Sequence, residues 1–257
     1  MNTKTALITG GSTGIGSSIA WKVAEQNVNV IINYRHSEQK AIELCEALTK
    51  KYGTKNIAIK ADITNEDECN YLIQQSLAKT DSIDILIHNA GPYIHEKKKM
   101  IEYSLDEWSY LINGNLQALF ILGKAIIPLM RKGNWGRIIT IGFDRAETAP
   151  GWMYRSAFAA AKSGVVSLTK TLALEEAENG ITVNMVCPGD IIGKWKESDI
   201  DDACTVKDDR TPVGRPGTGE DVARVIAFLI EPASSFITGS VIPITGAKDV
   251  LGKNLHQ

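Results

Sequence analysis

The sequence predicts a doubly wound α/β fold, with a mainly seven-stranded parallel sheet flanked by helices, in one domain over residues 1–257. Two observations predict it. Apolar, strand-like runs alternate with segments of helical periodicity, as in a parallel sheet covered by helices on both faces. Polar or glycine-containing turns follow several runs, where such sheets bind ligands. The runs are Ala6–Thr9, Val28–Tyr34, Ile57–Lys60, Ile83–His88, Arg137–Ile141, Thr182–Cys187 and Val241–Ile244.

A glycine-rich turn joins the first run to a helix over Ile15 to Gln26. Glycine lets the backbone turn tightly and approach a ligand. The new helix points unpaired N–H groups and the positive end of its dipole at that ligand, which suits a dinucleotide pyrophosphate. The spacing differs from the general G-x-G-x-x-G fingerprint, so an ordinary tight turn is the alternative. The expected cofactor contacts here are Gly10, Ser12, Thr13, Gly14, Ile15 and Gly16.

The end of the second run, Asn33-Tyr34-Arg35-His36-Ser37, bears on cofactor preference. A preference for NAD usually places an acid here, to bond the ribose 2′-hydroxyl, and this segment contains none. The planar guanidinium of Arg35 instead suits a 2′-phosphate. The sequence therefore favours NADP over NAD. A solvent-facing arginine at a strand end is the alternative interpretation.

Composition narrows the range of partners. A net charge of −2 and an isoelectric point near 6.1 provide no global basic field, so we expect neither nucleic acid nor a membrane as a partner. The four cysteines form no C-x-x-C pair and no signal peptide opens the chain, which predicts a cytoplasmic protein with reduced thiols. We expect no apolar stretch of the roughly 20 residues that cross a bilayer, and no linker that divides the chain.

Three further motifs follow in order. Asn89-Ala90-Gly91 succeeds the fourth run, Lys162 lies in an alanine-rich helical segment, and Pro188-Gly189 ends the sixth run. With the glycine turn, they resemble the short-chain dehydrogenase/reductase family, in its 3-oxoacyl-carrier-protein reductase branch, over roughly residues 4 to 248. The resemblance implies a Rossmann fold and a nicotinamide cofactor. The further cofactor contacts that it implies are Asp62, Ile63, Asn89, Ala90, Gly91, Lys162, Pro188, Gly189 and Ile191.

Two residues in these motifs have alternative interpretations. Asp62 matches the segment with which the family covers the adenine, but it could also start a helix, for which Thr64 or Asn65 would be the better cap. His88 replaces the first asparagine of the family's Asn-Asn-Ala-Gly motif. It could act as an acid, although a buried histidine with one satisfied hydrogen bond is the favoured interpretation.

The catalytic pattern departs from that of the family. There, a tyrosine exchanges a proton with the substrate carbonyl oxygen, a lysine four residues later tunes the tyrosine and binds the ribose, and a serine after the fifth strand holds the carbonyl oxygen. Lys162 matches the lysine, but Phe158 stands at the tyrosine position. The fifth run continues into Gly142 and Phe143, so the serine is missing too.

Tyr154 is the nearest phenol and the candidate for the replacement acid. In one continuous helix it would share a face with Phe158 and Lys162 but start about 6 Å too far along the axis. It therefore needs a helix that begins late or bulges there, and Pro150-Gly151 would allow a late start. A packing tyrosine at a helix start is the alternative interpretation.

Asn115, inside an apolar helical run, completes the catalytic set that the resemblance implies. In the family the backbone carbonyl of this residue holds a water in the proton relay. Asparagine is a poor helix former, so its position suggests a purpose. Asn113 is a competing candidate, and Asp144 and Arg145 could act on a substrate by position alone.

The leading hypothesis is an NADP-dependent oxidoreductase that reduces a carbonyl or acyl substrate, either a small molecule or one on an acyl carrier, by hydride transfer from NADPH. Its catalytic residues would be Asn115, Tyr154 and Lys162, and we expect no metal. The alternative is a catalytically impaired NADP-binding protein with a regulatory or binding role. The polar segment around residues 193–210 is expected to form a substrate lid. The resemblance also implies a homotetramer or a homodimer.

Overall fold

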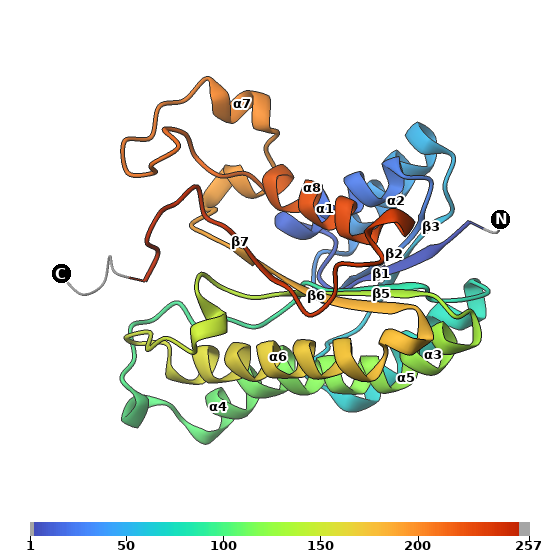
Figure 1. Cartoon of the computed structure of the whole chain (residues 1–257), viewed down its shortest axis with the longest axis horizontal. Helices are drawn as coiled ribbons and strands as arrows, with labels where there is room; N and C mark the ends of the chain where they lie inside the picture. Colours follow the sequence, from blue (N-terminus) through green and yellow to red (C-terminus); the bar gives the residue numbers. More distant parts are fainter. Residues whose placement is uncertain (1–2, 252–257) are drawn as a thin grey trace.

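A computed structural model describes residues 3–251 of the chain. Within them, seven strands form one parallel sheet in the order β3-β2-β1-β4-β5-β6-β7 (Figure 1). The predicted fold class is confirmed, and each strand begins and ends within two residues of a predicted run. The strands are β1 (Thr5–Ile8), β2 (Asn29–Tyr34), β3 (Asn56–Lys60), β4 (Ile85–His88), β5 (Gly136–Ile141), β6 (Ile181–Pro188) and β7 (Val241–Ile244).

Helices cover both faces of the sheet (Figure 1). One face carries α1 (Ile15–Glu25), α2 (Glu38–Tyr52) and α8 (Gly219–Ile230), and the other carries α3 (Glu66–Lys79), α5 (Ala118–Lys132) and α6 (Ser156–Glu175). Adjacent strand residues point to opposite faces, so Leu7 joins one apolar cluster and Ile8 the other. Both are fully buried, as expected for a strand inside a parallel sheet.

A continuous helical run of 28 residues, Leu105–Lys132, corrects one sequence expectation. It passes from α4 (Leu105–Ile112) through a π turn at Asn113–Gln117 into α5. By length and composition alone this run could cross a membrane, although no such stretch was expected. Half of its most apolar stretch is buried inside the protein, and α5 packs against α3, which accounts for its apolar character.

The start of α6 decides where Tyr154 lies. The helix begins at Ser156, so of the two conditions named for Tyr154 the structure shows the late start. Tyr154 precedes the helix in a turn, with a φ angle of +67°. The expectation that it shares a helix face with Phe158 and Lys162 is therefore wrong, because only the latter two belong to α6.

Candidate active site

The glycine turn closes tightly between β1 and α1. Gly10 and Gly14 have φ angles of +60° and +61°, which residues with side chains rarely adopt. A Cβ atom on Gly16 would lie 2.2 Å from the carbonyl oxygen of Gly10, so the turn has no room for a side chain there. Gly14, the N-cap residue of α1, has no side chain to satisfy the first N–H groups of the helix. This cradle fits the phosphate group that the sequence predicts.

A carboxylate from elsewhere in the chain sits at this helix end. The Gly14 N–H donates to Oε1 of Glu197 at 2.6 Å. The Ser18 hydroxyl, in the first turn of α1, donates to the carbonyl oxygen of Lys196 at 3.2 Å, so Lys196 and Glu197 lie against the start of this helix. The turn thus holds an anion in this structure, as its dipole and free N–H groups favour. Sequence reasoning missed Glu197, because nothing local distinguishes it from other exposed acids.

The Asn-Ala-Gly motif after β4 is fixed beside the glycine turn. The side-chain amide of Asn89 donates to the carbonyl oxygens of Thr9 and Gly10 at 3.0 and 3.1 Å. The Ala90 N–H donates to the Thr9 carbonyl oxygen at 3.0 Å. Two motifs that lie far apart in the sequence therefore form one rigid edge at the carboxyl ends of β1 and β4.

A first cavity, of about 360 Å³, lies along this edge. At its rim, the Arg35 guanidinium donates to the Tyr110 hydroxyl at 2.9 Å and pairs with Asp62 at 3.3 Å. Tyr110, on α4, was not anticipated from the sequence. The cavity brings together seven of the predicted cofactor contacts: Gly10, Thr13, Arg35, Asp62, Ile63, Ala90 and Gly91.

Asp62 holds the turn before α3 but does not cap the helix. Its carboxylate accepts from the backbone N–H and the hydroxyl of Thr64 at 2.9 and 2.8 Å. The cap is Asn65, whose side chain accepts from the Glu68 N–H, so the interpretation of Asp62 as the helix start is wrong. Burial favours a higher pKa for Asp62, but the hydrogen bonds from Thr64 and the charge of Arg35 together lower the pKa.

A second cavity, of about 500 Å³, lies between the Asn-Ala-Gly motif, the start of α6 and the end of β6. It collects eight predicted residues: Ile15, Asn89, Gly91, Tyr154, Lys162, Pro188, Gly189 and Ile191. The structure therefore brings Tyr154 and Lys162 to one cavity. The remaining predicted contacts Ser12, Gly14 and Gly16 belong to the glycine turn itself, and Asn115 lies buried behind Gly91.

Lys162 is the deepest charged group of this cavity, with only 3% of the residue exposed. Its ammonium donates to the carbonyl oxygen of Ile141 at 2.7 Å. Burial lowers the pKa of Lys162 to about 8. A Cβ atom on Gly91 would lie 2.2 Å from Oδ1 of Asn115 and 3.3 Å from Nζ of Lys162, so the glycine leaves room for both groups.

His88 and Asn115 form a buried pair next to this lysine. His88 Nε2 bonds the backbone carbonyl oxygen of Asn115 at 3.1 Å, while Nδ1 has no partner within the described residues. Burial, followed by the nearby charge of Lys162, lowers the pKa of His88 to about 3. The favoured interpretation, a buried histidine with one hydrogen bond, is confirmed. The π turn holds both candidate asparagines, but only Asn115 is fully buried, whereas Asn113 is half-buried.

Aromatic rings line one wall of the second cavity, where the family resemblance leads us to expect hydroxyl groups. Phe143 is buried, with its ring centroid 5.0 Å from that of Trp152, and Phe158 packs between Trp152 at 5.9 Å and Tyr93 at 5.0 Å. A Cβ atom on Gly142 would lie 2.6 Å from the sulfur of Cys187. The end of β5 therefore supplies no hydroxyl to this cavity.

The loop before α6 is held by hydrogen bonds to its backbone. The Tyr154 carbonyl oxygen accepts from the Tyr103 hydroxyl at 3.1 Å and from Arg155 at 2.8 Å. Asp144 and Arg145 do not line the cavity. They contact the end of the described chain instead, where the Val250 N–H donates to Asp144 at 3.3 Å.

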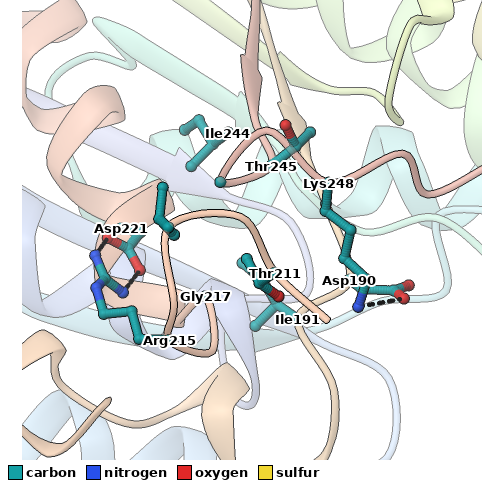
Figure 2. A pocket seen from close by; sticks show the side chains of 12 residues that line it. Asp190, Ile191, Thr211, Arg215, Gly217, Asp221, Ile244, Thr245 and Lys248 are labelled. Carbon is teal, nitrogen blue, oxygen red and sulfur yellow. Dashed lines mark hydrogen bonds and ion pairs between the residues drawn. The ribbon is translucent and has the colours of Figure 1, made fainter. Parts of the chain in front are cut away.

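A third, smaller cavity of about 140 Å³ lies beside the second. Figure 2 shows the side chains that line it. The two cavities share Gly189, Asp190 and Ile191 as lining residues. Across the third cavity, Arg215 pairs with Asp221 at 2.7 Å and Lys248 with Asp190 at 3.5 Å. Sequence reasoning did not anticipate it, because its walls come from three segments that are far apart in the chain.

Known proteins share this sequence over nearly its full length. The family model described as enoyl-(acyl carrier protein) reductase matches residues 10–246. YtkK of Bacillus subtilis (strain 168), named as a candidate oxidoreductase, is 49% identical over 250 residues, which cover 97% of this chain and 98% of that protein. The 3-oxoacyl-(acyl-carrier-protein) reductase FabG of Staphylococcus epidermidis is 35% identical over 244 residues, covering 95% and 98%.

Two solved structures also resemble this chain over nearly its full length. One described as a candidate 3-oxoacyl-reductase from Bacillus thuringiensis superposes with a TM-score of 0.90 at 46% identity, covering 97% of this chain and 100% of that one. A blue fluorescent protein from a metagenomic library, in complex with NADPH, gives 0.81 at 29% identity, covering 95% and 97%. With the parallel sheet, the glycine turn and the buried lysine, these matches lead to one conclusion: the chain belongs to the short-chain dehydrogenase/reductase family of oxidoreductase enzymes.

Proposed function

We propose that this protein reduces a carbonyl or acyl substrate, free or bound to an acyl carrier, with NADPH. The observation that carries the proposal is the convergence of the glycine turn, Arg35 and the buried Lys162 on two adjoining cavities. The acyl-carrier-protein reductases among its relatives support this substrate class. NADPH, when bound, supplies the hydride, and the residues of the chain bind it, orient the substrate and move the proton.

The preference for NADPH over NADH rests on Arg35. Its guanidinium lies at the rim of the first cavity, where the segment after β2 contains no acid that would select the 2′-hydroxyl of NAD. Arg35 is held by Tyr110 and Asp62, so its planar donors are already oriented. The NADPH complex of a structural neighbour is compatible with this preference.

In the proposed reaction, Tyr154 gives a proton to the substrate oxygen and Lys162 holds the ribose. Asn115 belongs to the path along which Tyr154 regains a proton. Tyr154 lines the same cavity as Lys162 because α6 begins only at Ser156. A phenol that lines this cavity can act as a general acid toward the oxygen of a bound substrate. Residues 193–210 act as the lid in this proposal, and the contact of Glu197 with Gly14 supports that role.

The proposal also includes a single domain in each chain, assembly into a homotetramer or a homodimer, and a cytoplasmic location. Large apolar side chains are exposed on the helices of one face, where Phe120 on α5 and Leu174 on α6 are 56% and 83% exposed. A second set, Phe228 on α8 and the fully exposed Phe236, lies before the edge strand β7. Exposed apolar patches of this kind mark subunit interfaces.

A second candidate function follows from the aromatic wall. Phe143 and Phe158 fill the two positions where the family resemblance leads us to expect a serine and a tyrosine. If no other group replaces them, the chain would bind NADPH without turning over a substrate, and would act as a regulatory or binding protein.

One experiment separates these functions. The purified protein is titrated with NADPH and NADH by fluorescence and assayed on a panel of 3-oxoacyl thioesters, small ketones and 2-enoyl thioesters. Saturable NADPH binding with turnover supports the reductase, and binding without turnover on any substrate favours the second function. Tyr154→Phe should then reduce turnover roughly 100-fold or more without weakening NADPH binding. Unchanged turnover would remove Tyr154 from the mechanism.

A further inference from the structure

A reductase site needs a group that holds the substrate oxygen as its negative charge develops. In a cavity walled by aromatic rings, a prepositioned hydrogen-bond donor stabilises that charge strongly. The end of β5 offers none here, because Gly142 has no side chain and Phe143 presents a ring. Of the residues that line the second cavity, only Tyr93 and Tyr154 carry a hydroxyl group.

Tyr93 is the one of these two whose hydroxyl is fixed in place. Nε of Arg155 donates to the Tyr93 oxygen at 2.5 Å, and the guanidinium carbon lies 4.9 Å from the centre of the Tyr93 ring. The other nitrogens of Arg155 donate to the backbone carbonyl oxygens of His95, Glu96 and Tyr154 at 2.8 to 3.0 Å. Three hydrogen bonds to backbone carbonyl oxygens therefore hold the guanidinium in place, and it cannot move together with the phenol.

The ring of Tyr93 is fixed as well. It packs edge to face against Phe158, with centroids 5.0 Å apart and planes at 85°, and against His95 at 4.9 Å. Phe158 in turn lies beneath Lys162, whose Nζ is 5.8 Å from its ring centroid. Tyr93, Phe158 and Lys162 thus form one contiguous stretch of the cavity wall.

The hydrogen of the Tyr93 hydroxyl has no acceptor among residues 3–251. A guanidinium group has only donors, so Arg155 cannot accept this hydrogen. Among residues 3–251, the only hydrogen bond of the Tyr93 hydroxyl is the one that it accepts from Arg155. The hydrogen is therefore free to point into the cavity that Tyr93 lines. A hydrogen bond received from a cation also makes a hydroxyl a stronger donor.

We infer that Tyr93 donates a hydrogen bond to the carbonyl oxygen of the substrate, and that Arg155 positions it. The inference rests on the proposed reductase function. The carbonyl carbon gains a hydride, the π electron pair moves onto the oxygen, and Tyr154 gives that oxygen its proton. Tyr93 keeps its own hydrogen throughout and stabilises the charge on the oxygen. The group that the end of β5 does not supply thus comes from the loop after β4.

The test replaces Tyr93 by phenylalanine, which preserves its packing against Phe158 and removes only the hydroxyl. With NADPH and the acetoacetyl thioester of N-acetylcysteamine, Tyr93→Phe should reduce kcat and kcat/KM together, by roughly 100- to 1,000-fold. The dissociation constant of NADPH should stay within twofold. Tyr71→Phe, which removes an exposed phenol from α3, is the matched control and should leave turnover unchanged.

A second readout does not depend on turnover. The infrared C=O band of the same thioester, labelled with ¹³C at the 3-oxo carbon, is recorded in the complex with NADP⁺, which cannot react with it. The hydrogen bond from Tyr93 lowers the frequency of this band, so the band should shift to higher frequency in Tyr93→Phe and stay unchanged in Tyr71→Phe. Arg155→Lys should lower kcat less than Tyr93→Phe does. The double variant, with both substitutions, should be no slower than Tyr93→Phe alone.

The possible failures are distinguishable. Wild-type turnover that persists in Tyr93→Phe within twofold would overturn the role of Tyr93 and leave the reductase function intact. A loss of turnover without a shift of the C=O band would also overturn it, because Tyr93 would then serve another step. Wild-type protein that binds NADPH but reduces no substrate of the panel would overturn the reductase function, and the inference with it.

Discussion

Gly14 and Glu197 meet at the N-terminus of α1, where the Gly14 N–H donates to the Glu197 carboxylate at 2.6 Å. The two residues lie 183 positions apart in the sequence. The glycine turn is the expected phosphate site, so the chain places its own negative charge where a phosphate of NADPH would bind. In the proposed function, NADPH would therefore compete with Glu197 for the same N–H group.

This competition predicts that Glu197→Gln binds NADPH more tightly. The amide is uncharged, so it is held less firmly by the helix dipole and is displaced more easily, and the dissociation constant should fall roughly 3- to 10-fold at low salt. Fluorescence titration of NADPH measures the change. Asp201→Asn, which removes an acid of α7 (Ile200–Cys204) that makes no hydrogen bond to the turn among the described residues, should have no effect. Weaker binding in Glu197→Gln would instead mean that Glu197 secures the bound cofactor.

Because the Arg35 guanidinium is the proposed partner of the 2′-phosphate, we expect its removal to weaken the binding of NADPH selectively. Arg35→Ala should raise the dissociation constant of NADPH roughly 10- to 100-fold, because a charged hydrogen-bonding partner of the 2′-phosphate is lost. The affinity for NADH, which lacks that phosphate, should change less than threefold. In Asp62→Asn the guanidinium keeps its place but loses its acidic partner at 3.3 Å, so NADPH should bind at least as well as in the wild type. Equal losses for both cofactors would refute the selectivity.

Because His88 is buried, we expect the free energy of unfolding to decrease as the pH falls. Its pKa is about 3 in the folded protein, against 6.5 for an ordinary histidine. The unfolded chain therefore binds the extra proton first as the pH falls below 6.5, so the free energy of unfolding decreases on acidification. Between pH 6.5 and pH 4.5 this one group should remove about 2 to 3 kcal/mol.

Urea unfolding at several pH values checks this effect. His88→Asn should lose stability less steeply with acid than the wild type over that interval. His36→Asn, at an exposed site after β2, is the control and should follow the wild-type profile. Parallel profiles for the wild type and His88→Asn would show that the histidine is not the sensitive group.

Phe158→Tyr should restore a phenol at the position four residues before Lys162. The ring is already held against Trp152 and Tyr93, and Nζ of Lys162 is 5.8 Å from its centroid, so the added hydroxyl would belong to the cavity that Phe158 and Lys162 both line. We expect turnover of the acetoacetyl thioester to rise roughly 10- to 100-fold. In this variant, Tyr154→Phe should no longer slow the reaction.

The control for this gain is Phe143→Tyr, which adds a hydroxyl to the neighbouring buried ring. Phe143 is 4% exposed, so its hydroxyl would be buried, and the variant should lose stability without gaining activity. Equal gains in the two variants would mean that any added hydroxyl suffices. No gain in Phe158→Tyr would show that the cavity does not orient a substrate for this phenol.

The sequence by itself determined the seven strands, the glycine turn and the position of Lys162 on a helix. These features depend on local signals, namely apolar periodicity, glycine spacing and a short motif, and each signal lies within one element. Even the burial of His88 followed from its place at the end of an apolar run. The seven predicted residues of the first cavity follow from the same kind of signal, since each lies in a turn just after a strand, whereas Tyr110 on α4 carries no such signal.

Only the tertiary structure decided which groups meet in the second cavity. Tyr93 and Arg155 are 62 residues apart, and neither belongs to a periodic pattern that would mark it. The loop before α6 is held by bonds from Tyr103 and Arg155 to the Tyr154 carbonyl oxygen, which no local pattern marks. Glu197 reaches Gly14 because the segment before α7 folds back over α1. Such contacts arise from long-range packing of loops, where the sequence carries no repeating signal, so their partners became evident only once the chain was folded.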